Sequence, residues 1–157
     1  MRQSRKGSRM RRTTLLFAFV AVALVLAVGV AFAATRNCTG GECRGTQGAD
    51  EIFGSEGDDV VLALGGNDRV YGREGNDGLK GGEGSDEVYG ELGNDKVKGS
   101  QGGDKVFGGP GDDVVRGGTH SRTNDGVRDL LDCGEGTDTV YYTPRKDEIR
   151  DCEILNP

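Results

Sequence analysis

The sequence is poor in the residues from which a globular core is built. The 157-residue chain has no Trp, one His and three Pro, and only 22 of the 124 residues after residue 33 are Leu, Ile, Val or Phe. So few large apolar residues, in a highly charged chain, are typical of polypeptides that do not fold unaided. The composition therefore argues against an enzyme with a buried pocket, and any fold needs a further source of stability.

Positive charge is also scarce beyond the N-terminus. Residues 1–33 hold six Lys or Arg and no acid, whereas residues 34–157 hold 14 basic and 26 acidic residues, a net charge of −12. Such a polyanion repels phosphate backbones and anionic lipid, and it attracts cations. We therefore expect no nucleic-acid partner.

The N-terminal segment indicates export. A basic stretch precedes twenty uncharged residues, 15–34, and Ala31-Phe32-Ala33 near their end is a small-x-small cleavage pattern. The segment predicts a helical secretory signal peptide over residues 1–33, cleaved after Ala33. The alternative is an uncleaved anchor, because an apolar run of this length can span a bilayer. Residues 34–157 are then either secreted or held on the outer side of the cytoplasmic membrane, which the chain contacts only through residues 15–34.

Four cysteines, an even number in an exported chain, predict disulfides. We favour the pairs Cys38–Cys43 and Cys133–Cys152, because the members of each pair are close in sequence. Other pairings are open on this evidence. A zinc site is the competing interpretation, but the chain has no Cys-x-x-Cys motif and a single His.

A nine-residue repeat fills the middle of the chain. Residues 45–116 divide, without insertion, into GTQGADEIF, GSEGDDVVL, ALGGNDRVY, GREGNDGLK, GGEGSDEVY, GELGNDKVK, GSQGGDKVF and GGPGDDVVR. Position 1 is Gly in seven of the eight, whereas positions 4, 6 and 8 are always Gly, Asp and aliphatic, respectively. Positions 1–6 predict a turn, and positions 7–9 predict a short strand with one buried side chain. Such units stack into a parallel coil, because none buries its apolar face alone.

The repeat resembles the G-G-x-G-x-D-x-U-x nonapeptide of the RTX, or haemolysin-type, calcium-binding repeats. The resemblance covers residues 45–116 and, in part, residues 133–141. It implies an all-β fold, a parallel β-roll (β-solenoid) with two repeats per coil, in which Asp carboxylates and turn carbonyls of repeats i and i+2 hold Ca²⁺. Position 2 departs from the pattern, since it is Gly only at Gly82 and Gly109.

The residues favour calcium independently of the family. Ca²⁺ takes about six to eight oxygen ligands, and with two repeats per coil the position-6 Asp residues form two rows, with coils about 4.8 Å apart. Carboxylates this close repel one another without a cation. Four Asp per row leave three gaps, so about six ions are expected. The predicted ligands are Asp50, Asp59, Asp68, Asp77, Asp86, Asp95, Asp104 and Asp113, with carbonyls of turn residues such as Gly57, Gly66, Gly75, Gly84, Gly93 and Gly102, and Asp138 as a weaker candidate.

An eighteen-residue rhythm lies over the nine-residue one. Position 9 is aromatic in the odd repeats, at Phe53, Tyr71, Tyr89 and Phe107, whereas the even repeats carry Leu62, Lys80, Lys98 and Arg116. This rhythm supports two repeats per coil, with an aromatic row on one sheet and a cationic row on the other. We expect the aromatic side chains to stack, with a platform for a glycan or cell-surface partner as the alternative. The cationic row is expected to keep its face soluble.

Both ends are predicted to cap the coil. Residues 34–44 form an N-terminal cap, and residues 117–157 hold decayed repeats, with Asp129 and Asp147 in place of the repeat Asp, and a disulfide-locked C-terminal cap. The sequences DCGEGTD and DCE in this segment resemble the ends of small secreted bacterial RTX-like proteins. Open coil ends expose strand edges, which is why caps are needed.

The expected function follows from these features. We expect a secreted calcium-binding protein that folds on binding Ca²⁺ outside the cytoplasm and serves as a structural, adhesive or surface-interaction module. The alternative is an export-linked or inhibitory accessory of a separate secreted enzyme. Catalysis is not expected, because His120 and Ser121 are sequence neighbours without an oxyanion element and the chain has no His-Glu-x-x-His motif.

Overall fold

The computed structural model describes residues 33–118 and 127–157. Within these ranges the secondary structure is β-strand, with no helix. The predicted signal helix and the pair His120–Ser121 lie outside the described residues. No helical segment in the two described ranges has the length and hydrophobicity needed to cross a membrane.

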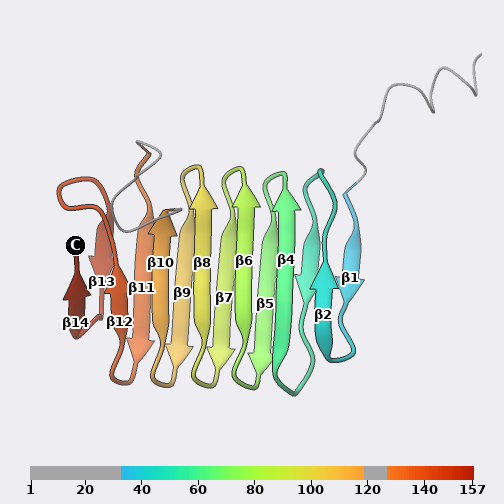
Figure 1. Ribbon diagram of the computed structural model, residues 1–157, viewed down its shortest axis with the longest axis horizontal. Helices are drawn as coiled ribbons and strands as arrows, with labels where there is room; N and C mark the ends of the chain where they lie inside the picture. The colour runs from blue at the N-terminus through green and yellow to red at the C-terminus, as the bar shows by residue number, and fades with distance from the viewer. Residues whose placement is uncertain (1–32, 119–126) are drawn as a thin grey trace, which may run out of the picture. The chain divides into compact units, whose positions relative to one another are not determined.

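The strands alternate between two parallel seven-stranded sheets, so each coil supplies one strand to each sheet. Figure 1 shows β4, β6, β8 and β10 pointing one way, and β5, β7, β9 and β11 pointing the other. This arrangement confirms the predicted parallel β-roll with two repeats per coil. The first sheet is β1 (Thr35–Asn37), β3 (Glu51–Phe53), β5 (Arg69–Glu74), β7 (Glu87–Leu92), β9 (Lys105–Pro110), β11 (Leu130–Glu135) and β13 (Glu148–Arg150). The second sheet is β2 (Gly41–Arg44), β4 (Asp59–Gly65), β6 (Gly78–Glu83), β8 (Lys96–Gln101), β10 (Val114–Gly118), β12 (Thr139–Tyr141) and β14 (Ile154–Asn156).

Most strands in the repeat region are longer than the sequence predicted. Strand β5 covers positions 7–9 of one repeat and positions 1–3 of the next, and in its second half Arg73 and Glu74 pair with Glu91 and Leu92 of β7. The prediction that positions 1–6 all turn was therefore wrong for positions 1–3. A high glycine content indicates that the backbone can turn at these positions. It does not show that they pair with the neighbouring coil as strand.

Position 2 has a demanding backbone conformation. Gly82 and Gly109 have φ of 135° and 117°, and the same position has positive φ at Leu64, Arg73 and Glu91, where it is 85°, 81° and 73°. Left-handed backbone costs a non-glycine residue about 1–2 kcal/mol. The family preference for Gly at position 2 thus has a steric cause, and this chain bears strain at Leu64, Arg73 and Glu91, where a side chain replaces Gly.

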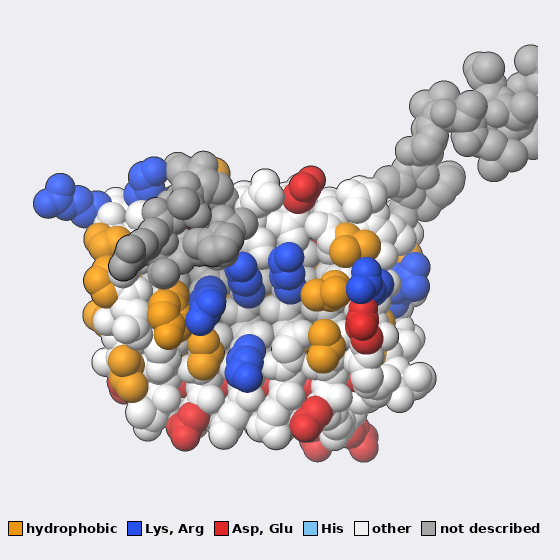
Figure 2. All heavy atoms as spheres, in the orientation of Figure 1, with side chains coloured by type: hydrophobic (Ala, Val, Ile, Leu, Met, Phe, Trp, Pro, Cys, Tyr) orange, Lys and Arg blue, Asp and Glu red, His pale blue; other side chains and the backbone are white. Residues whose placement is uncertain are grey.

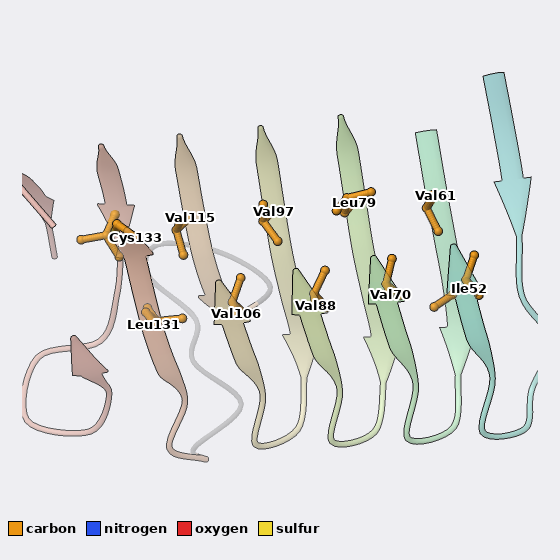
Figure 3. Packing of buried hydrophobic residues seen from close by; sticks show 12 residues of the cluster. Ile52, Val61, Val70, Leu79, Val88, Val97, Val106, Val115, Leu131 and Cys133 are labelled. Atoms are coloured by element: carbon orange, nitrogen blue, oxygen red, sulfur yellow. The ribbon is translucent and has the colours of Figure 1, made fainter. Parts of the chain in front are cut away.

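The core is a single column of position-8 side chains between the sheets (Figure 3). Each of these side chains is at most 2% exposed. Ala63 and Cys133, which replace Gly at position 1, add to the column. The position-8 residues are Ile52, Val61, Val70, Leu79, Val88, Val97, Val106, Val115, Leu131 and Val140.

The C-terminal segment continues the coil, as the sequence predicted. Strand β11 pairs with β9 and β12 pairs with β10, although the residues joined by hydrogen bonds across this step are 25 apart instead of 18. The seven extra residues are accommodated without interrupting either sheet. Disulfides join Cys38 to Cys43 and Cys133 to Cys152, which confirms the favoured pairing.

The aromatic row forms a continuous stack on the outer face of the first sheet. The ring centroids of Phe53, Tyr71, Tyr89 and Phe107 are 5.0, 5.1 and 4.7 Å apart, with interplanar angles of 8° or less. Each inner ring therefore has both faces covered by its neighbours. This geometry favours the expected stacking role, worth about 0.5–1.5 kcal/mol per pair, over a platform on which sugar rings stack.

Candidate metal centre

Two rows of buried carboxylates line the two sets of turns. All eight predicted Asp ligands lie in these rows, four in each, and none is more than 3% exposed. Asp129 extends the first row and Asp138 the second. The first row is Asp50, Asp68, Asp86, Asp104 and Asp129, and the second is Asp59, Asp77, Asp95, Asp113 and Asp138.

One oxygen of each carboxylate connects neighbouring coils. The backbone N–H of Asp77 donates to Oδ1 of Asp95 at 2.8 Å, and the N–H of Asp95 donates in turn to Oδ1 of Asp113 at 2.8 Å. The first row repeats the pattern, with the N–H of Asp50 donating to Oδ1 of Asp68 at 2.7 Å. The Asp at position 6 is therefore the residue that sets the register of successive turns.

The second carboxylate oxygen is buried without a hydrogen-bond partner along much of both rows. Within the described part of the chain this holds for Oδ2 of Asp68, Asp77, Asp86, Asp95, Asp113 and Asp138. A buried acceptor left unsatisfied costs about 1–3 kcal/mol, and more when it is charged. A repeated cost of this kind indicates that the oxygens serve a ligand.

Position-1 glycines let these oxygens approach the backbone closely, because a side chain there would collide with them. A Cβ placed on Gly72 would lie 2.4 Å from both Oδ2 of Asp77 and the carbonyl oxygen of Gly90. The same construction on Gly90 meets Oδ2 of Asp95 and the carbonyl of Gly108, each at 2.4 Å. A carboxylate oxygen and a carbonyl oxygen from the adjacent coil thus approach the same glycine, and both are the hard ligands that Ca²⁺ prefers.

From Gly66 to Gly111, the position-4 glycines are required by a close approach between coils. Gly84 has φ of 126°, and a Cβ on it would lie 1.8 Å from the carbonyl oxygen of Gly66. No other residue fits there without moving the turn. The predicted carbonyl ligands Gly57, Gly66, Gly75, Gly84, Gly93 and Gly102 all lie in these turns, and their role as ligands stays a prediction.

Several of the buried carboxylates have a raised pKa, so their ionised form is unfavourable. Burial raises the pKa of Asp68 and of Asp95 to about 6, and the neighbouring carboxylates of the row add to the effect. Burial also raises the pKa of Asp113 to about 7, with contributions from Asp95 and Asp138 on either side. At neutral pH these groups ionise at a cost, and a cation placed in the row removes it.

No three His, Cys, Asp or Glu side chains converge on one point within residues 33–118 and 127–157. A transition-metal site of the zinc type is therefore not formed by the described residues. Calcium differs, because backbone carbonyls complete its coordination shell. Pairs of carboxylates along a row, with carbonyls in between, suit Ca²⁺.

Sequence reasoning missed a second ladder, at position 5. Oδ1 of Asp58 accepts the backbone N–H of Asn76 at 2.8 Å, and Oδ1 of Asn76 accepts that of Asn94 at 3.0 Å. The ladder continues through Asp112 to Thr137. It runs opposite in direction to the position-6 ladder, so each turn is tied to both neighbours. The signal was the Asp/Asn at position 5 of every even repeat.

The acidic rows also continue into the tail beyond the predicted ligands. The N–H of Asp129 donates to Oδ1 of Asp147 at 3.3 Å, and the N–H of Asp138 donates to Oε2 of Glu153 at 2.9 Å. Asp129 and Asp147 were visible in the sequence as remnants of the repeat. Glu153 was not, because Glu replaces Asp and follows an altered spacing.

The fold and its turns define a parallel β-roll with carboxylate rows suited to divalent cations. Comparison with known families gives the same class: the RTX calcium-binding nonapeptide repeat matches in four copies, at residues 44–79, 63–97, 71–106 and 92–119. The chain is an RTX-type repeat protein, and its repeats bind calcium. No curated protein and no solved structure matches the chain at a significant level.

Proposed function

We propose that the protein is a secreted β-roll that folds on binding Ca²⁺ outside the cytoplasm and then serves as a structural or surface-interaction module. The observation that carries the proposal is the double row of buried carboxylates with unpartnered Oδ2 atoms, at Asp68, Asp77, Asp86, Asp95 and Asp113. Export is supported by the apolar segment 15–34 and by the disulfides, which persist in oxidising compartments.

Calcium is proposed to act as a folding ligand. The core consists of one aliphatic side chain per repeat, each worth about 1.5–3 kcal/mol when buried. Ordering a residue costs about 1.5 kcal/mol, so a nine-residue repeat does not recover its own entropy from that one side chain. Binding to the folded state alone contributes directly to folding.

The proposed ligands are the position-6 carboxylates, joined by backbone carbonyls of the turns. At Gly72 and Gly90, the Oδ2 atom of an Asp and a carbonyl oxygen of the next coil already lie close to the same glycine. Bound calcium supplies positive charge between the carboxylates, which reverses their mutual repulsion. The protein contributes the alignment, because Oδ1 is held by the backbone N–H of the preceding coil.

Circular dichroism with and without a chelator tests the proposal. We expect a disordered spectrum in excess EGTA and a strand spectrum after calcium is added, with magnesium at the same concentration giving little change, because Mg²⁺ favours octahedral sites with retained water. A strand spectrum that persists unchanged in excess chelator would contradict calcium-dependent folding. Export is tested separately, by sequencing the N-terminus of protein recovered from the medium, where the expected first residue is Ala34.

A further inference from the structure

The outer faces of the two sheets carry charge in different arrangements. On the first sheet, position 7 alternates in sign from strand to strand, through Glu51, Arg69, Glu87 and Lys105. Arg69 Nε lies 3.2 Å and Lys105 Nζ 2.8 Å from the carboxylate oxygens of Glu87. Alternation of this kind stabilises a sheet, because opposite charges face each other across strands.

The second sheet has the opposite arrangement. Lys80, Lys98 and Arg116 occupy neighbouring places in the register of β6, β8 and β10, and Lys96 lies beside them on β8. Among the described residues, Lys80, Lys96 and Arg116 take part in no ion pair. Figure 2 shows Lys and Arg side chains gathered over these strands. Like charges on facing positions destabilise a sheet, so the pairing of these three residues across the strands does not itself stabilise the sheet.

The same face is hollowed on both sides of the row. Gly78 and Gly82 have no side chains, and two depressions of about 420 Å³ each are lined in part by Lys80 and Lys98. One depression reaches Tyr141, whose ring lies 4.2 Å from the Arg116 guanidinium. The face therefore offers regularly spaced cations, room beside them and an aromatic ring at one end.

Carboxylates stand at the margins of this face. Glu42, on β2, is held by Arg44 at 2.6 Å, and Glu83 ends β6. The acidic turns border the sheet, and residues 34–157 carry −12 overall. A broad anionic surface, such as a bilayer or a nucleic-acid duplex, would meet all of these carboxylates, whereas a single narrow chain along the row meets the cations and, of these carboxylates, only Glu83, which lines one depression.

We propose that the cationic face, defined as Lys80, Lys96, Lys98, Arg116 and Tyr141, binds a linear acidic polysaccharide. Strands lie about 4.8 Å apart, so the row presents one cation per strand to carboxylate or sulfate groups spaced along an extended sugar chain. The depressions beside the row hold the sugar rings, and Tyr141 with Leu62 contacts their apolar C–H faces. The inference goes beyond the proposed function, although it uses the folded coil.

A matched pair of double variants tests the inference. Lys80→Gln with Lys98→Gln removes two charges from the cationic face, and Arg69→Gln with Lys105→Gln removes two from the paired row of the first sheet. The probe is a fluorescently labelled chondroitin sulfate oligosaccharide, followed by anisotropy in saturating calcium. We expect the first variant to weaken binding at least about tenfold and the second less than about twofold. A neutral dextran oligosaccharide should not bind.

Each remaining outcome counts against the inference. Equal losses of binding affinity in the two variants would show an effect of net charge and not a specific site. A folded wild-type chain that does not bind the labelled oligosaccharide would have no acidic-glycan site. Equally tight binding to single-stranded DNA or to phosphatidylserine vesicles, lost in the same variant, would overturn the choice of polysaccharide. Strand signal recorded on the same samples separates these results from failure of calcium-dependent folding, which would contradict the proposed function instead.

Discussion

Replacing Asp95 with Asn should have opposite effects with and without calcium. The Asn side chain keeps Oδ1, which accepts the backbone N–H of Asp77 at 2.8 Å, and it removes the charge shared with the buried, unpartnered Oδ2. Without calcium the substitution removes an unfavourable buried charge. With calcium it removes a proposed ligand, so the sign of the effect on stability should change.

The magnitude follows from the pKa of Asp95. Burial raises this pKa from 3.8 to about 6, and each pH unit corresponds to about 1.4 kcal/mol. At pH 7.5 the ionised carboxylate therefore costs the calcium-free fold about 3 kcal/mol, and Asp95→Asn should recover most of it. In saturating calcium the same variant should be less stable than wild type, by an amount set by the lost ion.

The assay is strand signal by circular dichroism in EGTA, over a series of sucrose concentrations that favour the compact state, followed by thermal melting in calcium. Asp112→Asn is the matched control, because Asp112 is exposed and its Oδ1 also bonds a backbone N–H of the next coil, that of Thr137 at 2.9 Å. It should change neither result appreciably. If Asp95→Asn destabilises the protein equally in both conditions, its carboxylate is a structural group and the reasoning fails.

Four further predictions concern pH, backbone strain and the C-terminal disulfide. The pKa values of Asp95 and Asp113 in the fold, about 6 and about 7, exceed the ordinary value of 3.8. The calcium-free fold should therefore be most stable near pH 4 and lose stability as pH rises to about 7. Strand signal in EGTA across this range measures the effect, and a signal that rises with pH would refute the argument. Protons compete with calcium for the same oxygens, so calcium affinity should fall as pH drops below about 6. Glu91→Gly should stabilise the calcium-loaded protein by about 1 kcal/mol in urea unfolding, because φ at Glu91 is 73°, and an unchanged midpoint would show that the strain is absent. Cys152→Ser should lower the free energy of unfolding by about 3 kcal/mol in the same assay, since the Cys133–Cys152 bridge closes a loop with a sequence separation of 19. Equal stability of the variant and wild type would show that this disulfide does not stabilise the C-terminal cap.

Periodicity made most of the fold predictable. Asp and the aliphatic residue recur at fixed places, and together with the eighteen-residue alternation of Phe53 and Leu62 they gave the coil, the two sheets and the two acidic rows. The tail was predictable for the same reason, since Asp129 and Asp147 keep the eighteen-residue spacing beyond the inserted residues. The favoured cysteine pairs also formed, because each joins residues that are close in sequence.

Other features depend on contacts between coils, which one repeat does not reveal. The pairing of Arg73 with Glu91 extends the strands into positions that look like turn. The stacking of successive coils brings the position-1 glycine, the Asp oxygen and a carbonyl of the adjacent coil into contact. The sequence of a single repeat does not show this contact. The contrast between the paired charges around Glu87 and the like charges around Lys98 became meaningful only once the register was known.

Titration calorimetry with calcium, combined with a strand spectrum, tests the central claim most directly. The comparison is between wild type and a variant in which Asp68, Asp77, Asp86 and Asp95 are all replaced by Asn, which keeps every Oδ1 hydrogen bond. We predict that wild type binds about six ions as it folds, and that the variant binds fewer and does not reach the wild-type strand signal. A variant equally compact in calcium, with the same number of bound ions, would contradict the account.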